Sequence, residues 1–225
     1  MTQFDCFSPD ALHFLKELKA NNTKDWFAAN KARYEAQLKA PGLQFADAIV
    51  GALAEMTGQD HTSKVFRIHR DVRFSKDKTP YNAHLHMAFT PAQQTSQPPM
   101  WFFGLSPERL TLGCGVFQYD KESLPAFRAA MGGGTGTKLI ALTDDLCKQG
   151  FRIGEPDLKR VPAGFDKDHP NAEALRRKGF ATWIDNSTPA SVTERGLVGR
   201  TIADLRQLMP VFHLMSEIAA AMQPD

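Results

Sequence analysis

The sequence has little of what usually reveals a protein's compartment or chemistry. Only three cysteines occur among 225 residues, Cys6, Cys114 and Cys147, and no two of them form a C-x-x-C pair. This scarcity argues against a disulfide framework and against a zinc ribbon. No stretch approaches 18 uninterrupted apolar residues, and the N-terminus has neither a basic segment nor an apolar core. We therefore expect no membrane association and no signal peptide, and we predict a cytoplasmic location.

An excess of charge of either sign is also missing. The chain has 27 Lys and Arg against 25 Asp and Glu, and this balance does not mark the whole chain as a nucleic-acid binder. With 42% apolar and 23% charged residues, the composition is close to that of ordinary globular proteins and excludes disordered or collagen-like chains. The sequence contains no Gly-x-Ser-x-Gly, no dinucleotide-binding glycine pattern and no His-Glu-x-x-His.

The hydrophobic pattern predicts an α+β fold in one domain spanning residues 1–225. Helix signals dominate the first quarter, where Ser8-Pro9 and Thr23 start two helices, Pro41 opens a third, and Gly58 ends it. We expect strands at 65–74, 81–89, 101–105, 110–117, 151–153, 158–161 and 180–184, and later helices at 120–131, 137–149, 170–179 and the C-terminus, interrupted at Pro210. The predicted fold is an antiparallel β-sheet of four or more strands packed against the N-terminal and C-terminal helices.

Residues 65–89 predict a β-hairpin. Alternation places Phe66, Ile68, Val72 and Phe74 on an apolar face, and the turn-like residues 75–80 follow. A pairing in which residue numbers sum to 155 puts polar residues together on one face, with Arg73 opposite Asn82, Asp71 opposite His84, and His69 opposite His86. A one-residue slip would destroy this arrangement.

The basic character of the chain is concentrated in this hairpin. Six cations and two anions between Lys64 and Lys78 give a local charge of +4, which leaves −2 for the rest of the chain. Guanidinium groups bind phosphate or carboxylate in a bidentate manner, and ammonium groups add point charge. The candidate ligand-binding residues are Arg67, Arg73, Lys76, Lys78, Asp71, Asp77, Tyr81 and His84. The alternative is a solvated sheet face on which the two aspartates pair with neighbouring cations.

Arg70 is the exception in the hairpin, because the alternation places it on the apolar face. A buried guanidinium must find a carboxylate or carbonyl groups, so we predict that Arg70 is a structural buried charge. Glu17, Asp25 and Glu35 on the early helices are available as partners.

Two further patterns suggest other chemistry. His69, His84 and His86 with Asp71 would suit a divalent metal, but neighbouring cations oppose one, and we predict no metal and no other cofactor. Asp71 and His84 could instead form an acid–base pair. The glycine-rich residues 132–136 do not match a phosphate-binding loop, because Thr137 separates Gly136 from Lys138.

Three segments carry a resemblance to a known family. They are Asn21-Asn22 to Trp26-Phe27, the long run from Arg67 to Tyr81, and the stretch from Arg160 to Pro170. In this order and spacing the chain resembles the conserved hypothetical proteins of domain-of-unknown-function family twenty-four sixty-one, over nearly its whole length. The resemblance implies no activity, substrate or catalytic residue, and residues 132–136 and His86 do not look like part of the family pattern.

Three functional hypotheses follow, in this order. The protein binds or acts on a small anionic ligand, with phosphate or carboxylate groups, through the Arg- and Lys-rich hairpin. Alternatively it is associated with nucleic acid, for which the sequence has few aromatic residues suited to base stacking. In the third hypothesis it is a structural or partner-binding protein without catalytic activity. The sequence decides neither whether the protein is an enzyme nor its oligomeric state.

Overall fold

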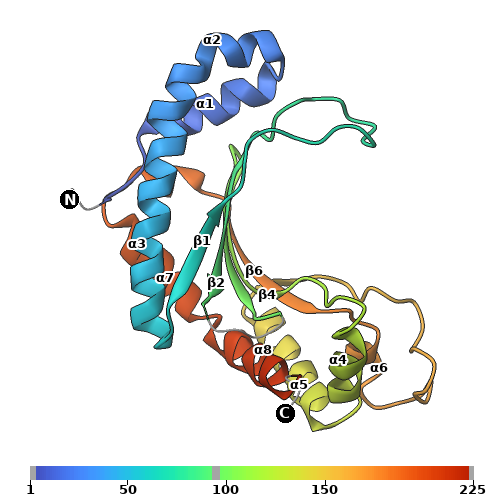
Figure 1. Cartoon of the computed structure of the whole chain (residues 1–225). Helices are drawn as coiled ribbons and strands as arrows, with labels where there is room; N and C mark the ends of the chain where they lie inside the picture. The colour runs from blue at the N-terminus through green and yellow to red at the C-terminus, as the bar shows by residue number, and fades with distance from the viewer. Residues whose placement is uncertain (1–3, 93–96, 223–225) are drawn as a thin grey trace. The chain divides into compact units, whose positions relative to one another are not determined.

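The computed structural model in Figure 1 describes residues 4–92 and 97–222. Contacts group the chain into two compact units, each built from separate segments. Unit 1 comprises residues 1–89, 102–112 and 185–204, and unit 2 comprises residues 90–101, 113–184 and 205–225. Strands β2, β3, β4 and β6 contribute residues to both units. The single domain over residues 1–225 stays a prediction.

The helices confirm the α-part of the predicted class. Their bounds are α1 Pro9–Ala20, α2 Lys24–Tyr34, the π-helical turn η1 Glu35–Lys39, α3 Ala40–Thr57, α4 Leu124–Met131, α5 Gly134–Lys148, α6 Ala172–Leu175, the 3-10 turn η2 Pro189–Thr193, α7 Leu197–Arg206 and α8 Met209–Ala221.

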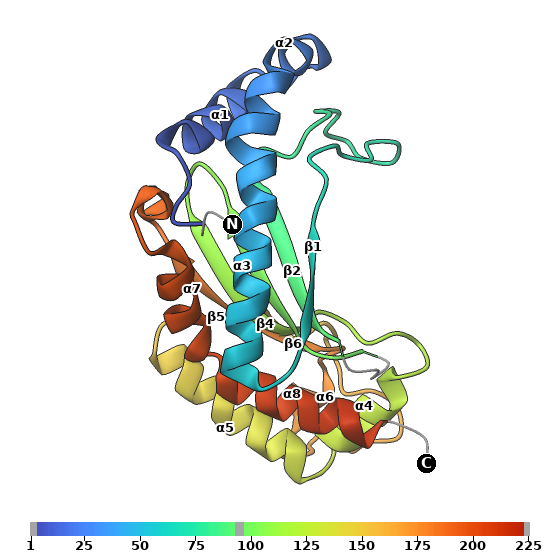
Figure 2. The same ribbon diagram turned by 60° about the vertical axis from the view of Figure 1, so that its left-hand side comes forward.

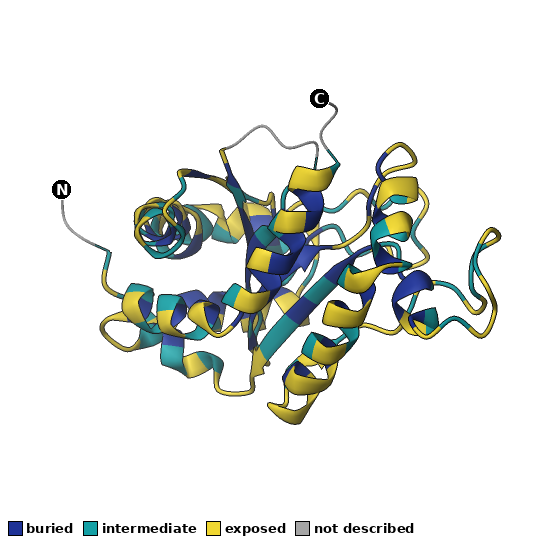
Figure 3. Cartoon of the chain, turned by 90° about the horizontal axis from the view of Figure 1, so that it is seen from below, coloured by how far each residue is buried: buried dark blue, intermediate teal, exposed yellow. Residues whose placement is uncertain are grey.

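The six strands form one antiparallel sheet in the order β1-β2-β3-β4-β6-β5. Their bounds are β1 His61–Val65, β2 Leu85–Pro91, β3 Met100–Leu105, β4 Leu110–Val116, β5 Arg152–Ile153 and β6 Phe180–Asn186. The α+β prediction with four or more antiparallel strands is therefore confirmed. The strands β2, β3 and β4 are mostly buried. The helices have a buried and an exposed side, as Figure 3 shows.

Local signals set the helix ends in unit 1. The Thr23 hydroxyl accepts a hydrogen bond from the Trp26 amide at 3.2 Å and thereby caps α2. Gly58 ends α3 with a φ of 71°, the left-handed conformation that glycine adopts without strain. Figure 2 shows α3 running along the face of the sheet, with β1 and β2 beside it in this view. Phe45 of α3 packs against Phe103 of β3, with 4.7 Å between ring centroids.

Unit 2 has its own core. Trp101, at the start of β3, is completely buried and stacks on Phe212 of α8 at a centroid distance of 5.0 Å. Val211, Leu214, Met215 and Ile218 of α8 are all buried, as their spacing predicts. The predicted strand at 158–161 does not form, and α6 is much shorter than the predicted helix between Pro170 and Gly179. Strand β2 ends at Pro91, two residues beyond the predicted end at residue 89.

The hairpin is where the prediction is most clearly wrong. Strand β1 ends at Val65, and between Phe66 and His84 only the isolated bridge of His69 with Tyr81 is β-structure. The predicted register places His69 opposite His86, with residue numbers that sum to 155, but the bridge pairs His69 with Tyr81, whose numbers sum to 150. In the same register, the Asn82 amide donates a hydrogen bond to the Ile68 carbonyl at 2.7 Å. We call residues 66–84 the cationic loop; in Figure 1 it extends beyond the strands β1 and β2.

Within the described residues, no helix is both long enough and apolar enough to span a bilayer.

Candidate functional site

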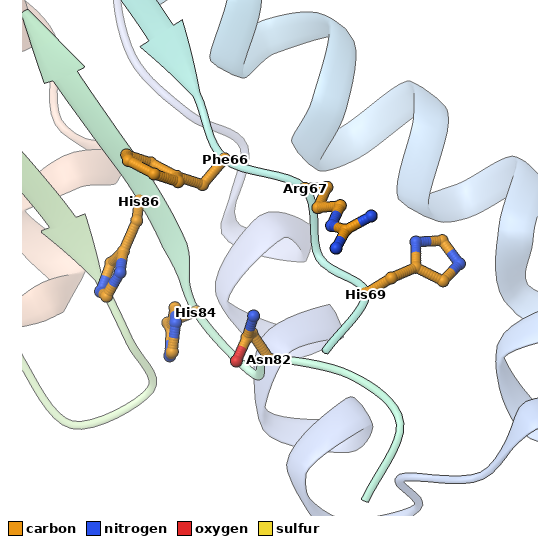
Figure 4. Close-up of a pocket in the computed structure, with 6 residues that line it drawn as sticks. All are labelled: Phe66, Arg67, His69, Asn82, His84 and His86. Carbon is orange, nitrogen blue, oxygen red and sulfur yellow. The ribbon is translucent and has the colours of Figure 1, made fainter. Parts of the chain in front are cut away.

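A depression of about 210 Å³ lies at the base of the cationic loop (Figure 4). Its lining comes from both sides of the loop and consists of Phe66, Arg67, His69, Asn82, His84 and His86. We call it the Arg67 pocket. In the view of Figure 4 the two rings of His84 and His86 lie on one side and Arg67 and His69 on the other, with Asn82 between them.

The base of the loop is fixed to the helices by Asn22, which follows α1. The Asn22 side chain donates to the Tyr81 carbonyl at 2.8 Å, and its oxygen accepts from the Tyr81 amide at 3.0 Å. One side-chain amide thus pairs with both backbone groups of Tyr81, as a neighbouring strand would. Phe27 of α2 stacks on the buried Tyr81 ring at 4.2 Å and meets His69 edge-on at 5.7 Å. These contacts join two of the three segments that carry the family resemblance.

A bulge shapes the histidine side of the pocket. The Phe66 amide donates to the His86 carbonyl, and the Asn82 amide donates to Ile68. The two-residue advance from Phe66 to Ile68 therefore lies opposite a four-residue advance from Asn82 to His86 on the returning segment. Ala83 and His84 are the two extra residues of this bulge. Such bulges redirect side chains, often beside functional sites. Here the rings of His84 and His86 stack, with 3.8 Å between their centroids.

The neighbouring strand provides the space for this stack. A Cβ atom added at Gly104 of β3 would lie 3.1 Å from Cδ2 of His86, which is tighter than ordinary packing. The missing side chain at Gly104 therefore leaves room for the His86 ring.

Both stacked histidines are less basic than usual. Burial lowers the pKa of His84, and the Arg70 charge lowers it further. Surrounding protein atoms, with a contribution from His84, lower the pKa of His86 to about 4, although His86 keeps an exposed surface. At neutral pH both imidazoles are therefore uncharged and each has a nitrogen that can accept a proton.

The predicted ligand-binding residues do not all converge. Arg67 and His84 line the pocket, and the buried Tyr81 supports it through Phe27 and His69. The remaining five residues lie along the cationic loop outside the lining: Asp71, Arg73, Lys76, Asp77 and Lys78. Phe66 and Asn82 line the pocket but were not among the predicted ligand-binding residues. Their positions in the lining depend on the pairing register, which the alternation of apolar and polar residues does not specify.

Ion pairs account for four of the loop's charges. Arg73 donates hydrogen bonds from Nε and Nη2 to the Asp71 carboxylate, and Nη2 lies 2.7 Å from Oδ2. Arg70 Nη1 lies 2.6 Å from Asp77 Oδ2 and also donates to the carbonyl and hydroxyl of Thr79. The Thr79 amide and hydroxyl, together with Arg70, lower the pKa of Asp77 to about 2.

Arg70 has a structural role, but in a different setting from the predicted one. Its side chain is 23% exposed, so it is half-buried rather than buried. Its carboxylate partner is Asp77 of the same loop and none of the early-helix residues Glu17, Asp25 and Glu35. The guanidinium therefore closes the loop on itself.

The other two sequence patterns have local explanations. The described residues contain no group of three or more His, Cys, Asp or Glu side chains that could hold a metal. The amides of Gly132, Gly133 and Gly136 donate to backbone carbonyls, and the Asn171 side chain bonds the carbonyls of Met131 and Gly133. A phosphate-binding loop needs several backbone N–H groups that point at the ligand, and these three already donate to carbonyl groups of the protein.

Comparison with known proteins identifies the family of this chain. A comparison with curated proteins found no match. The family described as conserved hypothetical protein (DUF2461) matches residues 10–214. This match covers most of the sequence, from α1 into the first part of α8, and includes the pocket at the base of the cationic loop. The chain therefore belongs to this family of conserved hypothetical proteins.

Proposed function

We propose that the protein binds a small anion with a phosphate or carboxylate group in the Arg67 pocket. The observation that carries this proposal is the presence of a guanidinium and two stacked imidazoles in one depression. Arg67 forms no direct ion pair with a carboxylate among residues 4–92 and 97–222. Its five N–H donors suit the paired oxygens of such a ligand.

The other lining groups complement that anion. The Asn82 amide offers two further donors, and His69, His84 and His86 offer ring nitrogens that donate or accept according to their protonation. The six lining residues include no hydroxyl, thiol or carboxylate. They therefore favour binding and proton exchange over the formation of a covalent intermediate on a serine or cysteine.

Loss of the Arg67 charge is expected to reduce the thermal response to anions by about half or more. Phosphate, sulfate or citrate at about 100 times its Kd should stabilise the wild-type protein by about 2.7 kcal/mol, or about 5–10 °C in melting temperature. Arg67→Ala should weaken binding by about tenfold or more, because it removes hydrogen bonds to a charged group. Differential scanning fluorimetry measures both effects.

Arg73→Ala is the matched control, since it removes an equal charge from the same loop but outside the pocket lining. A similar loss of response in both variants would show that net charge, and not the pocket, causes the stabilisation. A wild-type protein that responds to none of these anions would contradict the proposed function.

Anion binding is expected to strengthen as the pH falls. A bound anion raises the pKa of His84 and His86, so binding takes up a proton whenever the imidazoles are uncharged beforehand. Sulfate is the appropriate probe, because it does not titrate between pH 5.5 and 7.5, roughly the range in which histidine responds. Calorimetry should show increasing affinity toward pH 5.5 and a smaller increase in His84→Gln. An affinity that is flat across this range would exclude participation of the imidazoles.

Without an anion, the same histidines reduce stability in acid. Their pKa values are lower in the folded protein than the ordinary value of 6.5, so the unfolded chain binds more protons below that pH. Stability is fully present above pH 6.5 and decreases as the pH falls toward about 4, the folded pKa of His86. A bound anion opposes this decrease.

A further inference from the structure

The tip of the cationic loop displays an aromatic ring to solvent. Phe74 is 96% exposed, although the alternating pattern predicts that it packs in the core. Phe66, at the base of the same loop, is 44% exposed. Burying a phenylalanine side chain contributes about 1.5–3 kcal/mol, and Phe74 gains almost none of this in the folded chain.

The loop that carries Phe74 is braced by polar bonds. Lys78 Nζ crosses it to the Val72 carbonyl at 3.0 Å and to the Arg73 carbonyl at 3.4 Å. The Ser75 amide donates to the Val72 carbonyl, which closes the turn around Phe74. With the Arg70–Asp77 and Arg73–Asp71 pairs, these bonds fix the segments on both sides of the ring. The Phe74 ring therefore projects from a segment that hydrogen bonds and ion pairs hold in place.

The surroundings of both rings are cationic. The Arg73 guanidinium lies 5.9 Å from the centroid of Phe74, and Lys64 Nζ lies 5.0 Å from that of Phe66. Lys76, two residues beyond Phe74, is exposed and forms no ion pair with a described residue. After the two ion pairs, residues 64–78 keep a charge of +4. A partner of this surface must therefore be anionic and must offer a face for aromatic stacking.

We propose that the cationic loop binds single-stranded nucleic acid, with Phe74 stacking on a base and Lys76 and Lys78 facing the neighbouring phosphates. Exposed aromatic rings with adjacent cations are the elements that sequence-tolerant single-strand binders use. This proposal does not rest on the Arg67 pocket, because none of these cations lines it.

An anionic membrane fits the loop less well. Membrane insertion needs a contiguous apolar face, whereas Phe74 follows Arg73 directly and Val72 is half-buried. Duplex DNA fits less well too, because its bases are already stacked on one another and leave no free face for Phe74.

The experiment measures binding of the full-length protein to a fluorescein-labelled oligo(dT) of about 12 nucleotides, within the usual range of single-strand sites, by fluorescence anisotropy. We expect Phe74→Ala to weaken binding about tenfold, Phe74→Tyr to retain it, and Phe74→Leu to behave like alanine because it lacks a ring. Lys76→Gln should also weaken binding and reduce the salt slope by about 0.7. The matched control is Phe117→Ala, which truncates a different exposed phenylalanine that lies in unit 2, whereas Phe74 lies in unit 1.

The proposal would be overturned if the wild-type protein did not bind oligo(dT), or if it bound a duplex of the same length equally well or more tightly. It would also be overturned if Phe74→Ala or Phe74→Leu bound oligo(dT) as tightly as the wild-type protein does. Phe74-dependent binding to phosphatidylcholine vesicles containing phosphatidylserine, without binding of oligo(dT), would assign the loop to membranes instead. Because Phe74 packs against so little, its variants should melt with the wild-type protein, and the melting temperature verifies that each has folded.

Discussion

Gly115→Ala is expected to lower the melting temperature by about 10 °C, because the new methyl group meets backbone on the neighbouring strand. A Cβ atom at Gly115 of β4 would lie 2.1 Å from the carbonyl oxygen of Phe180 and 2.7 Å from Cα of Ala181. Both atoms belong to the backbone of β6, so no side chain can rotate away. The strands β4 and β6 must separate or Gly115 must change its conformation.

Changing the conformation is also costly, because Gly115 has a φ of 138°, where residues with a Cβ atom are strained. Strain of this kind costs of order 1–3 kcal/mol, and overpacking typically adds another 1–3 kcal/mol. Each kcal/mol corresponds to about 2–4 °C in a domain of this size, and a thermal melt followed by circular dichroism measures the sum.

Gly51→Ala is the control, since it makes the same chemical change in the opposite setting. Gly51 lies in α3, and an added Cβ atom would meet no other group within 4 Å. Alanine is favoured over glycine inside a helix by roughly 0.5–1 kcal/mol, so this variant should melt slightly above the wild-type protein. Equal melting temperatures for the two variants would be incompatible with close β4–β6 pairing at Gly115.

Elements fixed by local chemistry could be predicted from the sequence. Thr23 caps α2 through its own hydroxyl, and Gly58 ends α3 through its own backbone freedom. The β3–β4 hairpin likewise closes within four residues, where the Ser106 amide donates to the Arg109 carbonyl at 2.9 Å. None of these contacts requires knowledge of a distant part of the chain.

The cationic loop could not be predicted, because its apolar residues do not mark a sheet face. Period-two alternation assumes that apolar side chains face a core, and Phe74 is almost fully exposed. The loop is held instead by polar bonds that alternation does not encode, above all those of Arg70 and Lys78. Pairing of the two aspartates with neighbouring cations was one of the alternatives that the sequence offered, but the sequence did not show that Asp71 pairs with Arg73 and Asp77 with Arg70.

The pocket depends on two long-range features. The extra residues Ala83 and His84 change the register within the loop, which brings His84 onto His86. Asn22 pairs with Tyr81 across 59 positions of sequence. Both partners of this contact lie in segments that carry the family resemblance, but neither segment predicts the contact alone.

Phe27→Ala is expected to destabilise the protein by about 3–5 kcal/mol, the usual cost of removing a buried phenylalanine side chain. Phe27 is 5% exposed and contacts Tyr34, His69 and Tyr81 through its ring. Its removal leaves a cavity directly beneath the His69–Tyr81 bridge that closes the base of the cationic loop. Chemical denaturation measures the loss of stability.

The same substitution is expected to reduce the response to anions, although Phe27 does not line the Arg67 pocket. With the stack on Tyr81 gone, His69 and its neighbour Arg67 lose the surface that positions them, and binding must now include the cost of ordering them. Phe212→Ala is the matched control, because it removes an equally buried phenylalanine ring from unit 2, where Phe212 stacks on Trp101. The two variants should lose similar stability, but only Phe27→Ala should show a smaller anion-induced rise in melting temperature. If Phe27→Ala kept the full rise, the helices would support the fold of the loop without positioning its binding groups, and the Asn22 and Phe27 contacts would then be structural only.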